Sequence, residues 1–151
     1  MDQKNTISTL NDLIETLKDG QYGFKHASEN VEESDLKTLF NSYSIQRSKF
    51  AGELQQELVR MGESKPEEDA SVVGALHRGW INLKSALSGK SRHAILAECE
   101  RGEDHAVSAY KKATADGELP APVLELVNKQ YQEVLSAHNN VRSLRDASAK
   151  S

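Results

Sequence analysis

The amino-acid sequence predicts an all-α protein, a bundle of four long helices. Through four long segments, apolar residues recur every three or four positions, which is the spacing of one face of an amphipathic helix. The 151 residues include only 3 prolines and 5% aromatic residues, a composition that suits helices better than a β-sandwich. The length is ordinary for one domain with its own core, so residues 1–151 are expected to form a single domain.

The apolar stripes and the residues that flank them define the helices. Serine residues stand where helices should begin, and glycine residues stand where they should end. The predicted helices span about residues 6–31, 34–61, 71–87, 91–116 and 120–147.

The lengths of the connections predict how these helices are arranged. Only a short polar break follows the first helix, and Gly62 is placed to end the second, so the two should form an antiparallel hairpin. Gly117 and Pro120 separate the last two long helices in the same way. Residues 62–90 are enough to cross the whole length of the bundle, with the short helix 71–87 inside this crossover. Two hairpins joined by one long crossover form the ferritin-like topology.

Two charged residues fall on the apolar stripes, Arg47 in the second long helix and Glu103 in the third. A buried charge needs a partner. The crossover would make these helices parallel, and matching their starts at Ser34 and Ser91 brings Arg47 close to the level of Glu103. We therefore predict that Arg47 and Glu103 form an ion pair in the core, where a ferritin holds its metals.

A metal site is the alternative for this part of the bundle. Its likeliest ligands are Glu100, Glu103 and His138, and iron or manganese would be the metal. Ferritin-like di-iron sites use Glu-x-x-His motifs, which place both ligands on one helix face. The chain has no such motif: Glu53, for example, is followed three residues later by Gln56. No cofactor is expected on the first interpretation, and a degenerate di-metal site is the second.

Two further groups of residues are candidates for contacts with a ligand or a partner. Phe24, Tyr43 and His138 fall in one layer of the bundle and are the candidates for a small-ligand pocket. Arg78 and Trp80, in the short helix, belong to residue types that are enriched at protein interfaces. They predict a homo-oligomer, such as a dimer, assembled through the crossover.

Charge and hydropathy narrow the range of partners. The formal net charge is −4 and both signs are interspersed, so no basic patch for nucleic acid is expected. No apolar run approaches the roughly 20 residues that span a bilayer, and no signal peptide is recognisable. Cys99 is the only cysteine, which excludes an internal disulfide and favours a reducing, cytoplasmic location.

Three blocks of sequence carry a family resemblance. They are RSKFAGELQQEL at residues 47–58, GALHRGWINLKSAL at residues 74–87 and ECERGED at residues 98–104. With them the chain resembles, from about Thr6 to Asp146, a bacterial family of uncharacterised ferritin-like four-helix-bundle proteins, a domain of unknown function. The resemblance implies a ferritin-like fold and no activity. Some ferritin-like relatives are di-iron proteins or are associated with stress responses, but their Glu-x-x-His motifs have no match here.

Two functions are compatible with these observations. The preferred one is a non-enzymatic binding or structural module with a link to stress response, whose Arg47–Glu103 pair replaces a di-metal site. The alternative is a degenerate iron- or manganese-binding protein or oxidoreductase.

Overall fold

The structure is a computed structural model, and it describes residues 3–63, 80, 82–89, 91–115, 117 and 119–148. Within these residues the regular secondary structure is α-helix, with no strand, which confirms the predicted all-α fold class. The helices are α1 (Gln3–Asn30), α2 (Ser34–Arg60), α4 (Leu83–Gly89), α5 (Arg92–Ala115) and α6 (Ala121–Ser148).

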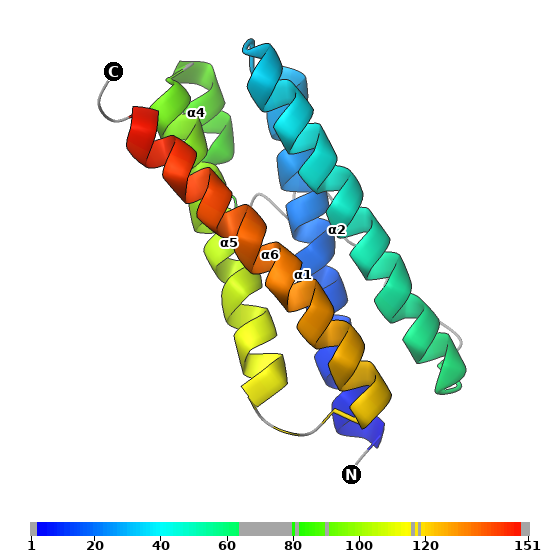
Figure 1. The fold of residues 1–151 in the computed structure, drawn as a ribbon. Coiled ribbons are helices and arrows are strands. Elements are labelled where there is room, and N and C mark those ends of the chain that lie inside the picture. The colour runs from blue at the N-terminus through cyan, green and yellow to red at the C-terminus, as the bar shows by residue number, and fades with distance from the viewer. Residues whose placement is uncertain are drawn as a thin grey trace.

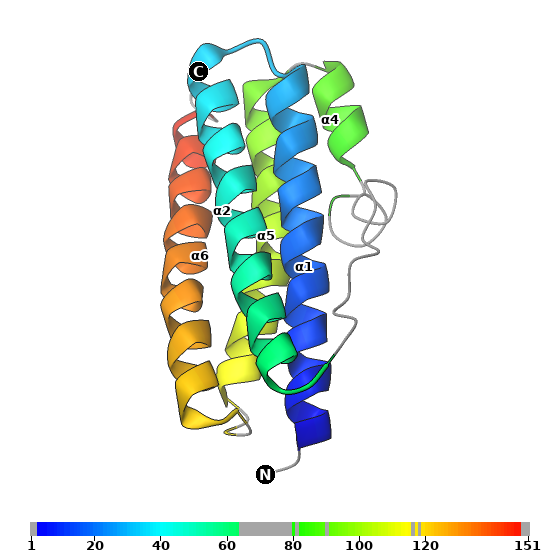
Figure 2. The same ribbon diagram turned by 90° about the vertical axis from the view of Figure 1, so that its right-hand side faces the viewer.

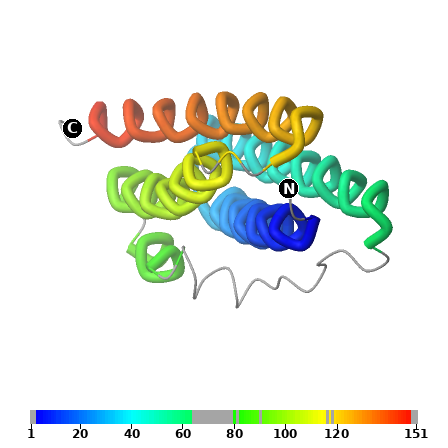
Figure 3. Tube along the Cα trace, turned by 90° about the horizontal axis from the view of Figure 1, so that it is seen from below, coloured from blue at the N-terminus to red at the C-terminus, as the bar shows by residue number. Residues whose placement is uncertain are grey.

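The four long helices lie side by side as two antiparallel hairpins, α1 with α2 and α5 with α6 (Figures 1 and 2). In Figure 2, α1 rises from the N-terminus, α2 and α5 both descend, and α6 rises again. The arrangement therefore fits a ferritin-like bundle, in which the second and third long helices are parallel. Seen from below in Figure 3, α4 lies outside the four and packs on α5 and α1.

The ends of the helices show which local signals the chain uses. Gly62 has a φ of 90°, and its N–H and that of Glu63 donate to carbonyls of the last turn of α2, so the glycine ends the helix. The backbone N–H of Ala94 donates to the hydroxyl of Ser91, which caps α5 as expected. Ser34 differs from the prediction: it is the first residue of α2, and Glu33 stands in the capping position.

The short helix of the crossover also differs from the prediction. Helix α4 begins only at Leu83 and ends at Gly89, whereas a helix was expected over 71–87. Trp80 and Asn82 lie outside any helix. Trp80 turns its indole into the bundle, where it packs against Gly23 of α1 and Gly102 of α5. Residues 71–79 of the expected helix lie outside the described residues.

Two apolar clusters fill the bundle, one above the other. The larger surrounds Leu17, Leu54 and Tyr110 and reaches from the middle of the bundle to the end where α1 begins. The smaller surrounds Phe24 and Trp80 at the opposite end. The two clusters meet at the level where the stripes of α2 and α5 carry their charged residues, and this level positions the site.

Candidate functional site

Arg47 and Glu103 meet in the middle of the bundle. Arg47 Nη1 donates to Glu103 Oε1, and Nη2 donates to Oε2 over 2.7 Å, so both carboxylate oxygens accept from one guanidinium. Both residues have an exposed fraction of 0%. Two parallel N–H···O bonds of this kind are the most directional contacts that an arginine makes. The structure therefore brings together the two charged residues that interrupt the apolar stripes of α2 and α5.

A glycine, an aromatic ring and an amide oxygen surround the guanidinium of Arg47. Gly20 of α1 faces it, because a Cβ on this glycine would lie 3.5 Å from Arg47 Nη1. The Phe24 ring lies 5.5 Å from Arg47 Cζ, and Arg47 Nε donates to Gln46 Oε1 over 3.1 Å. Burial acts to lower the pKa of Arg47, but the charge and hydrogen bonds of Glu103 outweigh it and raise this pKa above its ordinary value. The arginine is therefore firmly charged.

A second buried polar layer connects α2, α5 and α6. The Tyr110 hydroxyl donates to Gln130 Oε1 over 2.7 Å. Gln130 Nε2 donates to Glu53 Oε1 over 2.9 Å and to the Phe50 carbonyl over 3.3 Å. Burial raises the pKa of Tyr110, so its hydroxyl stays protonated and remains a donor.

Gln130 was missed by the sequence prediction. The apolar spacing of α6 could have identified it, because Gln130 lies three residues after Val127 and four before Val134, on the buried stripe of this helix. An amide on such a stripe raises the same question as Arg47 and Glu103, namely which partner satisfies it.

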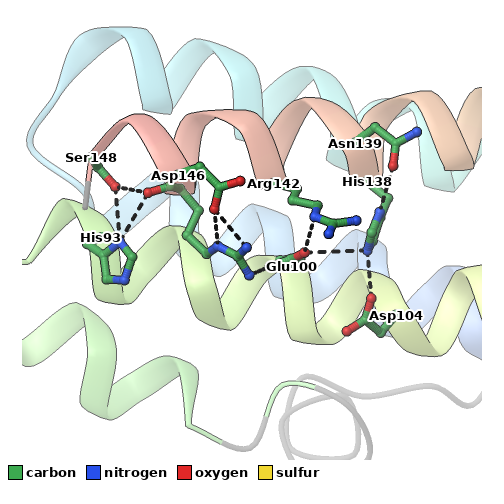
Figure 4. A network of polar contacts seen from close by, with 9 residues as sticks. His93, Glu100, Asp104, His138, Asn139, Arg142, Asp146 and Ser148 are labelled. Atoms are coloured by element: carbon green, nitrogen blue, oxygen red, sulfur yellow. Dashed lines mark hydrogen bonds and ion pairs between the residues drawn. The ribbon is translucent and has the colours of Figure 1, made fainter. Parts of the chain in front are cut away.

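A cluster of one histidine and two carboxylates lies between α5 and α6 (Figure 4). His138 Nε2 is 2.6 Å from Asp104 Oδ1 and 3.8 Å from Glu100 Oε2. The other ring nitrogen, Nδ1, is 3.1 Å from Asn139 Oδ1. One potential ligand atom from each of Glu100, Asp104 and His138 lies within 4.8 Å of the others, so the group has the donor types and the spacing for one metal ion.

Two arginines of α6 accompany this cluster. Arg145 Nη1 donates to Glu100 Oε1, and Arg145 Nη2 donates to Asp146 Oδ1 over 2.8 Å. Arg142 Nε lies 3.9 Å from Glu100 Oε2, and the side chain of Arg142 is 60% exposed. One oxygen of Glu100 is thus occupied by Arg145, while the other faces His138.

The three residues proposed as metal ligands do not lie together. Glu100 and His138 are neighbours, but Glu103 does not join them, because both its oxygens bind Arg47. Asp104 is in its place. Positions i and i+4 of a helix share a face, so Asp104 lies beside Glu100. Glu103 is rotated by about 100° from Asp104 around the helix axis and points toward the centre of the bundle.

The residues predicted for a ligand pocket are packed against their neighbours. Phe24 is fully buried, and its ring centroid is 5.3 Å from that of Tyr43 and 4.9 Å from that of Trp80. The Tyr43 hydroxyl accepts a hydrogen bond from Asn140 Nδ2 over 2.8 Å. Side chains fill the space beside Phe24, and His138 directs its ring nitrogens to acceptors on α5 and α6.

Trp80 is also placed differently from the prediction. It is 1% exposed and buried in this chain's own core, so it does not offer its ring to a second subunit. A Cβ on Gly23 or on Gly102 would lie less than 3.0 Å from the indole, so these two glycines of α1 and α5 form the slot that holds it. Arg78, the other residue predicted at an interface, lies outside the described residues.

Comparison with known proteins identifies the family of the chain. Residues 5–116, from α1 to the end of α5, match the family model described as "Domain of unknown function (DUF2383)". No curated protein matches the sequence significantly. Among the described helices, none combines the length and the hydropathy needed to cross a bilayer. The family model spans well over half of the sequence, and the chain therefore belongs to the family of the domain of unknown function DUF2383.

Proposed function

We propose that this protein is a non-enzymatic structural or binding module with a ferritin-like architecture. The observation that carries the proposal is the Arg47–Glu103 pair, fully buried at the level where the two apolar clusters meet. A permanently charged guanidinium supplies there the positive charge that a metal pair would otherwise supply, and it repels further cations from the same space.

The state of the surrounding groups supports the same function. Both oxygens of Glu103 accept from Arg47, so neither is directed at an open coordination position. The Tyr110–Gln130 layer next to it is satisfied by hydrogen bonds within the chain. A group that must bind and release a substrate keeps open positions, whereas closed networks of this kind rigidify a core.

The alternative is a di-iron or di-manganese protein with Glu100, Glu103 and His138 as ligands. It would require Glu103 to leave Arg47 and turn toward α6, which would leave a fully buried guanidinium without its partner. The cost of such a separation, about 3–5 kcal/mol, argues against it.

Iron oxidation distinguishes the two functions. Untagged, metal-free protein would be loaded anaerobically with Fe²⁺, exposed to oxygen, and followed by the absorbance of Fe³⁺ and by elemental analysis. We expect the rate of oxidation to equal that of protein-free buffer. Rapid oxidation with a pair of iron ions per chain, abolished in the double variant Arg47→Met/Glu103→Leu, would overturn the proposal.

We also propose that the module assembles as a homo-oligomer, such as a dimer, through the crossover between α2 and α5, and that it serves in stress response. Arg78 in the crossover supports the proposed assembly, because arginine is enriched at protein interfaces. Sedimentation velocity of wild type, Arg78→Glu and the control Arg60→Glu tests it. Arg60 is an exposed residue at the end of α2. We expect only Arg78→Glu to shift the protein toward a monomer, and an unchanged sedimentation coefficient would contradict this interface.

A further inference from the structure

We propose that Glu100, Asp104 and His138 form a site for one divalent transition-metal cation, with Zn²⁺ as the best-suited ion, in the seam between α5 and α6. This site is separate from the bundle centre and goes beyond the proposed function, which concerns Arg47 and Glu103. It would give the module a bound cation without giving it a di-metal centre.

The positions of the three residues carry the proposal. Glu100 and Asp104 are four residues apart on α5 and share a face, and His138 reaches them from α6 (Figure 4). Zinc bonds to histidine nitrogen and carboxylate oxygen at about 2.0–2.2 Å, which sets neighbouring ligand atoms about 3.4 Å apart. The 3.8 Å between His138 Nε2 and Glu100 Oε2 is close to that value.

Asp104 is the residue that would have to move. Its Oδ1 is 2.6 Å from His138 Nε2, which is a hydrogen-bond distance, so the two atoms must separate slightly to admit an ion. The Asp104 side chain is 62% exposed and can make this movement in solvent. The exposed side of the site also leaves room for a water molecule as a further ligand.

The orientation of His138 favours a metal at Nε2. Nδ1 lies 3.1 Å from the amide oxygen Asn139 Oδ1, to which an N–H on Nδ1 would donate. Without a metal, an N–H on Nε2 donates to Asp104 Oδ1; a bound cation would take the place of that proton, and the proton on Nδ1 would leave the Nε2 lone pair to bind the cation between the two carboxylates. Metal-binding histidines usually donate their second ring N–H to a fixed oxygen acceptor in this way.

Glu100 is positioned by an arginine and keeps one oxygen for the cation. Its side chain is 9% exposed, and Arg145 holds Oε1 while Oε2 faces His138. Arg145 also binds Asp146, so its charge is shared between two carboxylates. Arg142 is the cation that competes for Oε2, at 3.9 Å, and its exposed side chain is free to swing into solvent.

Calorimetric titration of metal-free protein with ZnCl₂ near neutral pH tests the site. We expect one Zn²⁺ per chain for the wild type, and binding weakened by at least about 10–100-fold in His138→Ala and in Asp104→Asn. His105→Ala is the matched control, because His105 is an exposed histidine next to Asp104 on the same helix. Arg142→Gln should bind Zn²⁺ more tightly than the wild type, because it removes the competing cation.

Visible absorption spectroscopy with Co²⁺ reports the ligands of the bound metal directly. Co²⁺ in place of Zn²⁺ should give the visible absorption of a nitrogen- and oxygen-ligated ion, present in wild type and His105→Ala and lost in Asp104→Asn. Asp104→Asn changes an exposed side chain, so its fold can be verified by circular dichroism even if His138→Ala is unstable.

Three outcomes would overturn the proposal. They are no Zn²⁺ binding by the wild type, equal binding by the wild type and Asp104→Asn, and equal losses in His105→Ala and His138→Ala. Iron oxidation that depends on Glu103 would overturn the proposed function instead, so the two failures are distinguishable.

Discussion

At the scale of single residues, the slot between Gly23 and Gly102 shows how closely this bundle is packed. The indole of Trp80 lies where side chains at these positions would have to be. An indole is rigid and this one is buried, so it cannot give way as the end of a flexible side chain could. The two glycines therefore set how far Trp80 enters between α1 and α5.

Gly102→Ala should destabilise the protein by about 1–3 kcal/mol, because the new methyl group forces the indole or the helix to shift. Gly52→Ala is the control: it is also helical and has nothing within 4 Å of its Cβ direction, so it should stabilise by about 0.5–1 kcal/mol. Urea denaturation measures both. Equal changes in the two variants would contradict the role of the slot.

Glu103→Gln should lower the free energy of unfolding by about 3–5 kcal/mol, because it leaves Arg47 charged and buried without its partner. Glu57→Gln removes the pair with Arg60, whose side chain is 70% exposed, and should cost less than about 1 kcal/mol. The comparison uses denaturant unfolding at one ionic strength. A loss for Glu103→Gln as small as that for Glu57→Gln would show that the buried pair is not needed.

The sequence carries information about buried residues that it lacks for exposed ones. Arg47 and Glu103 stand out because each interrupts an apolar stripe. The predicted starts of the two helices, at Ser34 and Ser91, place both residues at about the same height along the bundle. Asp104 interrupts nothing: it is an acid on the exposed face of a charged helix, where acids are common. Its meeting with His138 depends on how α5 and α6 are rotated against each other, which no spacing within one helix encodes.

At the scale of elements, the ends of the helices hold the bundle in register. Arg92, at the start of α5, donates to Glu33 over 2.6 Å and to Asp35 over 2.9 Å. Both acids stand at the start of α2, so these bonds join the beginnings of the two parallel helices. They fix at the surface the same register that the buried ion pair fixes in the core.

Asp35→Asn should lower the melting temperature at neutral pH, and the difference should vanish in acid. The hydrogen bond to Arg92 and its charge lower the pKa of Asp35 below its ordinary value of 3.8. Because the folded-state pKa is the lower one, the stabilisation is present above pH 3.8 and is lost as the pH falls through the lowered pKa. Melting curves of both proteins across this range check it, with Asp12→Asn, an exposed acid of α1, as control. A difference that persists in acid would contradict the link.

Gly62→Ala should destabilise the protein by about 1–2 kcal/mol. Its φ of 90° lies in the left-handed region, which an alanine adopts only with strain. Gly89→Ala is the control, because Gly89 ends α4 without a positive φ and has open space at its Cβ direction. Thermal or urea unfolding of the two variants would show the difference, and equal stability would mean that strain at Gly62 is relieved elsewhere.

Most element boundaries could be predicted, because glycine and serine at helix ends act through local chemistry. Gly62 and Ser91 are where the structure uses them. The position of Trp80 before α4 could not be predicted, since a stripe that includes Trp80 looks the same whether the ring continues a helix face or turns inward. The slot that decides between these is made by glycines on two other helices.

At the scale of the whole molecule, the ion pair separates two apolar clusters that would otherwise merge. The lengths of the connections were enough to predict the arrangement of the helices, because short turns force antiparallel neighbours. They do not determine how the helices slide along one another. A single polar contact at the junction of the clusters restricts that sliding, because any other register would leave a charge buried alone.

The double variant Arg47→Met/Glu103→Leu should be more stable than Glu103→Gln alone, because no buried charge is left unpaired. The register of α2 against α5 should be less well fixed, and backbone amide signals from these helices should broaden or double in two-dimensional NMR spectra. A single sharp set of signals at the wild-type positions would show that packing alone specifies the register.

The burial of Trp80 gives the molecule an optical reporter of its own. It is the only tryptophan of the chain, and it lies just before α4, with its indole enclosed by α1 and α5. An enclosed indole emits at shorter wavelength than a hydrated one, so its fluorescence records whether Trp80 is seated between α1 and α5. Circular dichroism records the helices. A red shift without loss of ellipticity would mark a state in which Trp80 has left this position while the four long helices stay folded.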